Sequence, residues 1–149
     1  MTIVPVEVDD AAAVAHFIER VIRASVDATD KEKEDFIVHT RRNVELWAAA
    51  PGEALHLKCV AAGGALLGVV MVKQYWNLCH LFVAPAAQGQ GLGRALLEAA
   101  VSACRARRVR PYVRLNSARN AVGFYERLGF VRVPDAPAAY AGMQFELPL

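Results

Sequence analysis

The sequence has few cysteines, no long apolar run and almost no excess charge. Its three cysteines, Cys59, Cys79 and Cys104, are odd in number and far apart, so we expect reduced, partly buried thiols. No stretch of 18 apolar residues is present, which argues against a membrane-spanning helix. The formal net charge of +2 gives no reason to expect nucleic acid or a membrane surface as a partner.

Two further signals are missing. The four histidines show no spacing to Cys, Asp or Glu that is typical of a metal site, so we predict no metal. The first residues contain no basic leader followed by an apolar core, so we expect no signal peptide and a cytoplasmic protein. With 149 residues, of which 55% are hydrophobic, the chain fits one α/β domain spanning residues 1–149.

The most informative stretch runs from residue 78 to residue 103. Leu78 to Val83 is an apolar run typical of a strand, and Pro85 ends it. Glycines at positions 89, 91 and 93 follow, and a helical period of apolar residues begins at Leu92. A strand, a glycine loop and a helix place free backbone amides and a positive helix end at one point. This arrangement predicts an anion site, and a phosphate is the anion expected there.

The spacing of the glycines differs from two common nucleotide loops. A Walker loop requires Gly-Lys-Ser/Thr, and the chain has no such sequence. A Rossmann loop requires an acidic residue about 20 positions further on, where this chain has Pro111 to Leu115. A nucleotide- or dinucleotide-binding domain is therefore a disfavoured alternative.

The loop and a later segment together resemble one known family. The loop reads Gln88-x-x-Gly91-x-Gly93 after Leu-Phe-Val-x-Pro, and residues 120–130 read Asn-Ala-Val-Gly-Phe-Tyr-Glu-Arg-Leu-Gly-Phe. Both motifs, in this order, are similar to those of GNAT-type N-acetyltransferases. The resemblance is specific over residues 78–130 and loose in the first half of the chain.

This resemblance implies a three-layer α/β fold with a mixed, mostly antiparallel sheet of about six to seven strands and about four helices. It also implies acetyl-CoA or coenzyme A as co-substrate, with backbone groups near Phe82 and Val83 on the pantetheine arm. The loop amides and Arg94 would hold the pyrophosphate. The cofactor-binding residues that it implies are Leu81, Phe82, Val83, Gln88, Gly89, Gln90, Gly91, Leu92, Gly93, Arg94, Asn116, Asn120 and Tyr125.

Two of these positions have an alternative explanation. Tyr125 matches the family's general acid, and a phenol with a pKa near 10 stays protonated at neutral pH. The alternative is that Tyr125 only packs, as Phe124 does. Asn116 and Asn120 fit cofactor contacts and helix caps or turns equally well.

The general base is harder to assign, because residues 54–97 contain no Asp or Glu. His80 is the candidate base on the central strand, although a histidine in an apolar strand is more often structural. Cys79 is more simply an inert thiol than a nucleophile. Glu34, Glu45 and Glu53 in the first half are the alternatives.

The remaining pattern predicts the other elements. Thr2 to Val8 is expected to be an edge strand, Asp9 or Asp10 a helix cap, and Thr29-x-x-Glu32 a capping box. Leu55 to Ala62 and Leu66 to Tyr75 predict a hairpin. The apolar spacing of Leu78, Leu81 and Val83 predicts a β-bulge. Further predicted elements are a helix over 117–128, a strand over 130–133, a loop over 134–141 and a last strand over 143–147.

We therefore expect an N-acetyltransferase that moves an acetyl group directly from acetyl-CoA to a primary amine. A small-molecule acceptor is favoured over a protein, and the resemblance favours a homodimer over a monomer. The alternative is an acyl-CoA-binding sensor that has lost catalysis, which the missing carboxylate on the central strand would explain. Both hypotheses predict thermal stabilisation by CoA. Thiol release from acetyl-CoA that depends on an amine is expected only of the enzyme, so this measurement separates the two.

Overall fold

The computed structural model describes residues 1–134 and 140–147. Within these residues the α-helices are α1 (Ala11–Ser25), α2 (Asp30–Ala49), α3 (Leu92–Arg107) and α4 (Val122–Arg127). The strands are β1 (Thr2–Pro5), β2 (Ala54–Val60), β3 (Leu66–Lys73), β4 (Asn77–Val83), β5 (Tyr112–Ser117), β6 (Val131–Val133) and β7 (Ala141–Glu146).

All of these strands belong to one sheet with the order β1-β2-β3-β4-β5-β7-β6. Every neighbouring pair is antiparallel except β4 and β5, which are parallel. The predicted mixed, mostly antiparallel sheet of about six to seven strands, flanked by about four helices, is confirmed.

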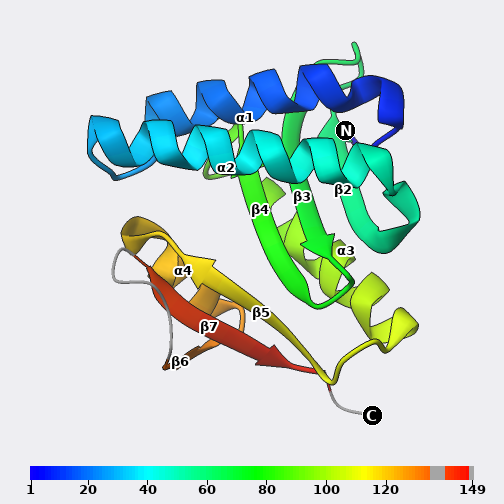
Figure 1. Cartoon of the computed structure of the whole chain (residues 1–149), viewed down its shortest axis with the longest axis vertical. Coiled ribbons are helices and arrows are strands. Elements are labelled where there is room, and N and C mark those ends of the chain that lie inside the picture. Colours follow the sequence, from blue (N-terminus) through cyan, green and yellow to red (C-terminus); the bar gives the residue numbers. More distant parts are fainter. Residues whose placement is uncertain (135–139, 148–149) are drawn as a thin grey trace.

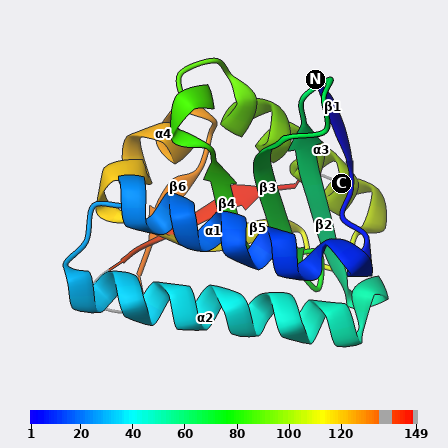
Figure 2. The ribbon, with the colours of Figure 1, turned by 90° about the horizontal axis from the view of Figure 1, so that it is seen from above.

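The helices form two layers, one on each face of the sheet (Figures 1 and 2). α1 and α2 lie together on one face, where Ile18 and Trp47 pack with Val69 and Met71 of β3. α3 covers the other face with Leu96, against residues such as Val70. Alternate residues of β3 thus enter opposite cores, as the two-residue period of a strand requires.

The capping box predicted at the start of α2 is present. Thr29 Oγ1 accepts a hydrogen bond from the Glu32 amide at 3.1 Å, and Glu32 Oε1 accepts one from the Thr29 amide at 2.9 Å. These two bonds satisfy donors that a helix start otherwise leaves free.

Replacing Thr29 with alanine is therefore expected to lower the free energy of unfolding by about 1 kcal/mol. Urea unfolding measures this change, and Thr29→Ser, which keeps the hydroxyl, is the control. An unchanged unfolding midpoint for Thr29→Ala would contradict the role of the cap.

Two predicted helix starts differ from the structure. Asp10 occupies the cap position before α1, as predicted, but its carboxylate does not bond the helix; it accepts from the Glu7 amide at 2.9 Å and pairs with Lys58 at 2.8 Å. The helix predicted from residue 117 begins at Val122, because Ser117 is still the last residue of β5. The predicted loop over 134–141 lies largely outside the described residues, and β7 begins at Ala141.

The turn between β3 and β4 has an unusual backbone. Gln74 and Tyr75 have φ angles of 55° and 64°, and the Trp76 amide donates to the Lys73 carbonyl at 3.2 Å. Two positive φ angles in a two-residue turn favour glycine or asparagine. Here, the guanidinium of Arg107, the last residue of α3, covers the turn and lies 4.5 Å from the centre of the Tyr75 ring.

Candidate active site

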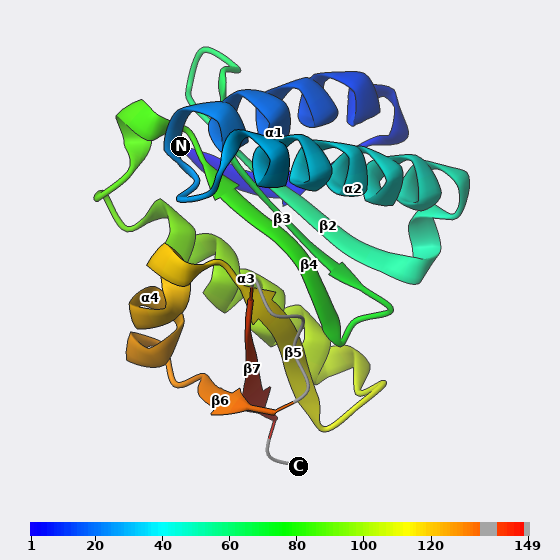
Figure 3. The ribbon, with the colours of Figure 1, turned by 60° about the vertical axis from the view of Figure 1, so that its left-hand side comes forward.

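The two parallel strands at the centre of the sheet separate soon after they meet. β4 and β5 share only the bridge between Asn77 and Arg114, so the rest of β4 has no strand partner on that side. A cleft of about 840 Å³ opens there, and it extends from Gln88 past the strand ends to α2. The elements that surround it are seen in Figure 3.

The predicted bulge is in β4. Met71 of β3 pairs with His80 and the next residue, Val72, pairs with Leu78, so Cys79 has no partner on β3. Because of this extra residue, Cys79 and His80 both lie on the α1–α2 side, whereas strict alternation would put them on opposite faces. Both residues line the cleft.

His80 forms a buried pair with His56 of β2. Their Nε2 atoms are 3.2 Å apart, so one ring donates to the other. Burial lowers the pKa of His56 to about 4 and that of His80 well below its ordinary value. Both rings are therefore neutral at pH 7. Both Nδ1 atoms are sealed from solvent and have no hydrogen-bond partner among the described residues.

The glycine loop has the geometry of an anion site. Gly89 and Gly91 have φ angles of 80° and 81°, and a Cβ atom at either would meet open space. The first backbone bond of α3 runs from the Ala95 amide to the Gly91 carbonyl at 3.0 Å. The amides of residues 89–94 thus precede the helical hydrogen bonds and can bind a phosphate.

The side chains before and after the glycine loop, Gln88 and Arg94, both have partners within the protein. Gln88 Nε2 donates to the Val83 carbonyl at 3.0 Å, which ties the loop to the end of β4. Arg94 is exposed and pairs with Glu98 at 2.6 Å, one helical turn further on. The backbone at Gln90, Leu92 and Gly93 completes the predicted loop set, and Leu92 is a buried residue at the start of α3.

Tyr125 lies on α4 and lines the cleft across from β4. Its ring packs edge-on against Phe124 and Phe130, with centroids 5.2 and 5.5 Å away. Burial raises the pKa of the Tyr125 phenol above its ordinary value, so the hydroxyl stays protonated over the physiological range. The structure thus combines the two alternatives: the ring packs, and the residue faces the cleft.

Other predicted cofactor residues gather on the same cleft. Leu81, Phe82 and Val83 line it from β4, and Asn116 and Asn120 line it from β5 and the turn before α4. Neither asparagine caps a helix, because Ala118 and Ala121 occupy the cap positions.

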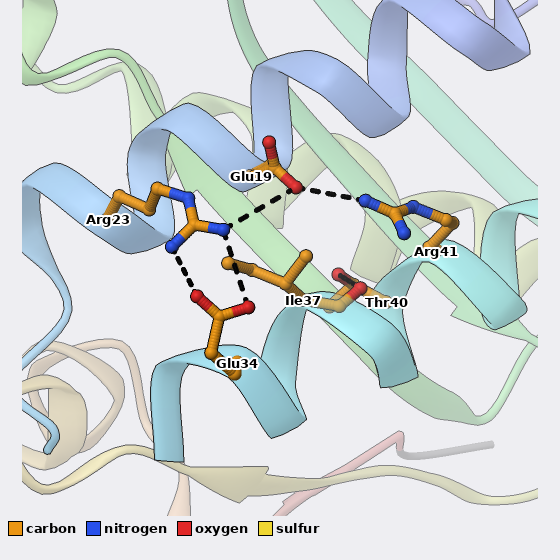
Figure 4. A network of polar contacts seen from close by, with 6 residues as sticks. All are labelled: Glu19, Arg23, Glu34, Ile37, Thr40 and Arg41. Atoms are coloured by element: carbon orange, nitrogen blue, oxygen red, sulfur yellow. Dashed lines mark hydrogen bonds and ion pairs between the residues drawn. The ribbon is translucent and has the colours of Figure 1, made fainter. Parts of the chain in front are cut away.

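α1 and α2 form the wall of the cleft opposite Tyr125. Ion pairs on the exposed side of these helices connect them (Figure 4). Glu19 binds Arg41 at 2.9 Å and Arg23 at 3.9 Å, and Arg23 also binds Glu34. The hydrogen bond from Arg23 lowers the pKa of the Glu34 carboxyl. Exposed pairs stabilise little, but a shared network keeps the two helices aligned.

The alternative bases suggested from sequence do not line this cleft. Glu34 is held by Arg23, Glu45 lines a groove on the outer side of α1 and α2, and Glu53 is exposed before β2. Of the described cleft residues, Asp35 alone carries a carboxylate. Sequence reasoning missed Asp35 and its cleft neighbours on α2, because the α2 pattern marks the buried face and not a ligand site.

No group of three or more His, Cys, Asp or Glu side chains stands close enough to hold a metal ion in residues 1–134 and 140–147. None of the helices in these ranges is long and apolar enough to cross a membrane.

Comparison with known proteins shows which family this fold resembles. A family model described as an acetyltransferase (GNAT) domain matches residues 24–146. A GCN5-related N-acetyltransferase from Rhodopseudomonas palustris has 20% sequence identity and a TM-score of 0.81, over 98% of this chain and 95% of that chain. A comparison with curated protein sequences gives no match.

Two similar structures contain the cofactor. PaiA N-acetyltransferase from Thermoplasma acidophilum, in complex with coenzyme A, has 18% identity and a TM-score of 0.76 over 97% of this chain and 98% of that chain. YncA from Salmonella typhimurium, with acetyl-CoA, has 20% identity and a TM-score of 0.73 over 100% and 95% of the two chains. The chain belongs to the GNAT acetyltransferase family, and thus to the acyltransferases.

Proposed function

We propose that this protein transfers an acetyl group from acetyl-CoA directly to the primary amine of a small-molecule acceptor. One observation carries the proposal: a single cleft connects Gln88, the residue before the glycine loop, with the bulge of β4 and the wall formed by α2. A cofactor that enters along the loop and an amine that enters along α2 would meet at the bulge. The two GNAT structures with coenzyme A or acetyl-CoA support the choice of cofactor.

In this proposal the amides of residues 89–94 and the Arg94 guanidinium bind the pyrophosphate of CoA. The pantetheine arm lies along β4 and takes the place of a strand, because the backbone of Phe82 and Val83 has no strand partner on the β5 side. Asn116 and Asn120 contact the arm from the opposite wall.

The chemical step exchanges one bond for another. The amine nitrogen attacks the thioester carbonyl carbon, the C–N bond forms, and the C–S bond breaks. Tyr125 gives its proton to the departing thiolate, which leaves as the free thiol of CoA, and the amine gives up one proton. Burial raises the pKa of the Tyr125 phenol, so the hydroxyl holds its proton at neutral pH, although the same shift makes it a weaker acid toward the thiolate.

His80 is the candidate acceptor of the amine proton. Its imidazole is neutral and lies at the bulge, but Nε2 contacts His56 and Nδ1 is sealed from solvent, so the ring must shift to take up a proton. The burial that lowers its pKa also weakens it as a base. If His80 is the base, His80→Gln should lower kcat about a hundredfold and remove the acid limb of the pH profile of kcat/KM. His16→Gln, at an exposed position on α1, is the control. An unchanged profile for His80→Gln would assign the proton to solvent.

The function itself is tested by incubating the protein with acetyl-CoA and a panel of primary amines while free thiol is measured. The proposal predicts thiol release that depends on the amine and yields the acetylated amine by mass spectrometry. CoA binding without thiol release above background would favour the acyl-CoA sensor.

Gly91→Ala is expected to weaken CoA binding about tenfold, because an alanine with a φ of 81° is strained and the loop amides would shift. Gly64→Ala is a matched control: its φ is 90° and it also faces open space, but it lies in the β2–β3 turn. Both variants should lose similar thermal stability, and only Gly91→Ala should lose CoA affinity by calorimetry. Equal CoA affinities would contradict a role for the loop.

A further inference from the structure

The cleft continues beyond the bulge to an end that the CoA proposal does not use. Val83, near the glycine loop, and Asn77, at the other end of β4, both line the cleft. At about 3.3 Å per residue, these two ends are about 20 Å apart. The end away from the loop is formed by Asn77, its strand partner Lys73 and, from α2, Asn43.

Lys73 points into this end. Val69 and Met71 pack in the core on the α1–α2 side, and Lys73 continues the same alternate row of β3. The half-buried side chain of Lys73 lines the cleft. Its charge also acts on the bulge: burial raises the pKa of the Cys79 thiol, and the ammonium of Lys73 opposes that shift.

The charge of Lys73 has no partner among the described residues, unlike those of the other three lysines of the chain. Lys31 and Lys58 form ion pairs with Asp35 and Asp10, and Lys33 donates to the Arg23 carbonyl. Because no described side chain neutralises it, the ammonium of Lys73 can attract an anion into this part of the cleft.

The charged residues near Lys73 do not neutralise its positive charge. Glu53, next to the Ala54 partner of Lys73, is exposed and forms no ion pair with it. Arg114, the bridge partner of Asn77, adds a second positive charge and donates to the Pro134 carbonyl. Asp35, the carboxylate of the cleft wall, is already paired with Lys31 at 3.2 Å.

The two asparagines add neutral hydrogen-bond donors. Asn43 is a buried residue of α2, and it lines the cleft. Asn77 faces the same side as Lys73, because paired strand residues share a face. One ammonium with carboxamide donors suits a singly charged carboxylate, whereas doubly charged phosphates favour arginine forks.

We propose that the acceptor amine carries a carboxylate, bound at the end of the cleft away from the glycine loop by Lys73 with Asn43 and Asn77. The acceptor would then be an amino acid or a similar amino carboxylate, with its amine at the bulge. This inference rests on the proposed acetyl transfer and narrows its substrate class.

The first test compares primary amines of matched length that end in a carboxylate, a phosphonate, a carboxamide or a trimethylammonium group. The carboxylates should have the highest kcat/KM. Lys73→Met should lower that value about tenfold to a hundredfold, the range for one lost charge-assisted contact, and leave the carboxamides within about twofold. Arg105→Met, which removes an exposed charge from α3, is the control. A preference for phosphonates or cations, or equal losses across the series, would overturn the proposal.

A second measurement does not depend on turnover. The four lysines can be labelled by reductive ¹³C-methylation, and Lys73→Arg assigns one signal in the NMR spectrum. In the presence of CoA, an amino carboxylate should shift the Lys73 signal and its carboxamide should not. If CoA binds but no amino carboxylate moves that signal, the carboxylate site is wrong and the proposed function stands. If CoA itself neither binds nor is released from acetyl-CoA, the proposed function fails.

Discussion

Tyr125→Phe is expected to lower kcat about a hundredfold or more and to leave CoA affinity within about twofold, because a positioned general acid contributes about 10² to 10⁴ in rate. The ring contacts with Phe124 and Phe130 do not involve the hydroxyl, so the variant should keep its fold. Steady-state kinetics with calorimetric CoA binding measure the two effects separately.

The matched control for this variant is Tyr112→Phe. Tyr112 is on β5 outside the cleft, and its hydroxyl accepts a hydrogen bond from Arg110 at 2.9 Å. Turnover should not change in that protein. A Tyr125→Phe enzyme with unchanged kcat would withdraw the general-acid role and leave Tyr125 as a packing residue. A loss of thermal stability together with activity would point to the same conclusion.

Stability is expected to fall between pH 7 and pH 5 because of the buried pair of His56 and His80. The unfolded chain binds protons on its histidines near pH 6.5, whereas burial holds the pKa of folded His56 at about 4. The unfolded state therefore takes up more protons as pH falls, and the free energy of unfolding decreases through this window. At pH 5 the loss is about 2 kcal/mol from His56 alone, and His80 adds to it with the same sign.

Between pH 7 and pH 5 the stability change comes from the histidines and not from the carboxylates. The pKa values of Asp10, Glu32 and Glu34 are lowered in the fold, each mainly by a hydrogen bond, so the stability that these groups contribute is lost only below about pH 4.5. Urea unfolding at pH 5, 6 and 7 measures the effect, and the exposed His16→Ala variant should show the same pH dependence. Equal unfolding free energies at pH 5 and pH 7 would mean that the pair is protonated or solvated in the folded protein.

Local sequence patterns predicted the parts of the site that are formed within one segment. The capping box at Thr29 and Glu32, the bulge at Cys79 and the glycine turn before α3 each depend on residues a few positions apart. Their geometry follows from backbone preferences and from the two-residue period of strands.

Sequence patterns did not predict contacts between distant segments. His80 was singled out alone, but its partner His56 is 24 residues earlier and reaches it from β2. Asp10 was expected to cap a helix, yet Lys58 is 48 residues away and binds it instead. Lys73 lay within the predicted hairpin strand Leu66 to Tyr75 without a role, and only the separation of β4 from β5 gives it a cleft to face. These features follow from the packing of the sheet against α1 and α2.

The central claim is that the cleft binds acetyl-CoA. The most direct measurement is a thermal shift with acetyl-CoA, CoA, ATP and NAD in parallel, because a ligand that binds only the folded state raises the midpoint of unfolding. We predict a rise of a few degrees or more with acetyl-CoA and CoA, and none with NAD or ATP. No shift with either CoA compound, or an equal shift with NAD, would contradict the proposed function.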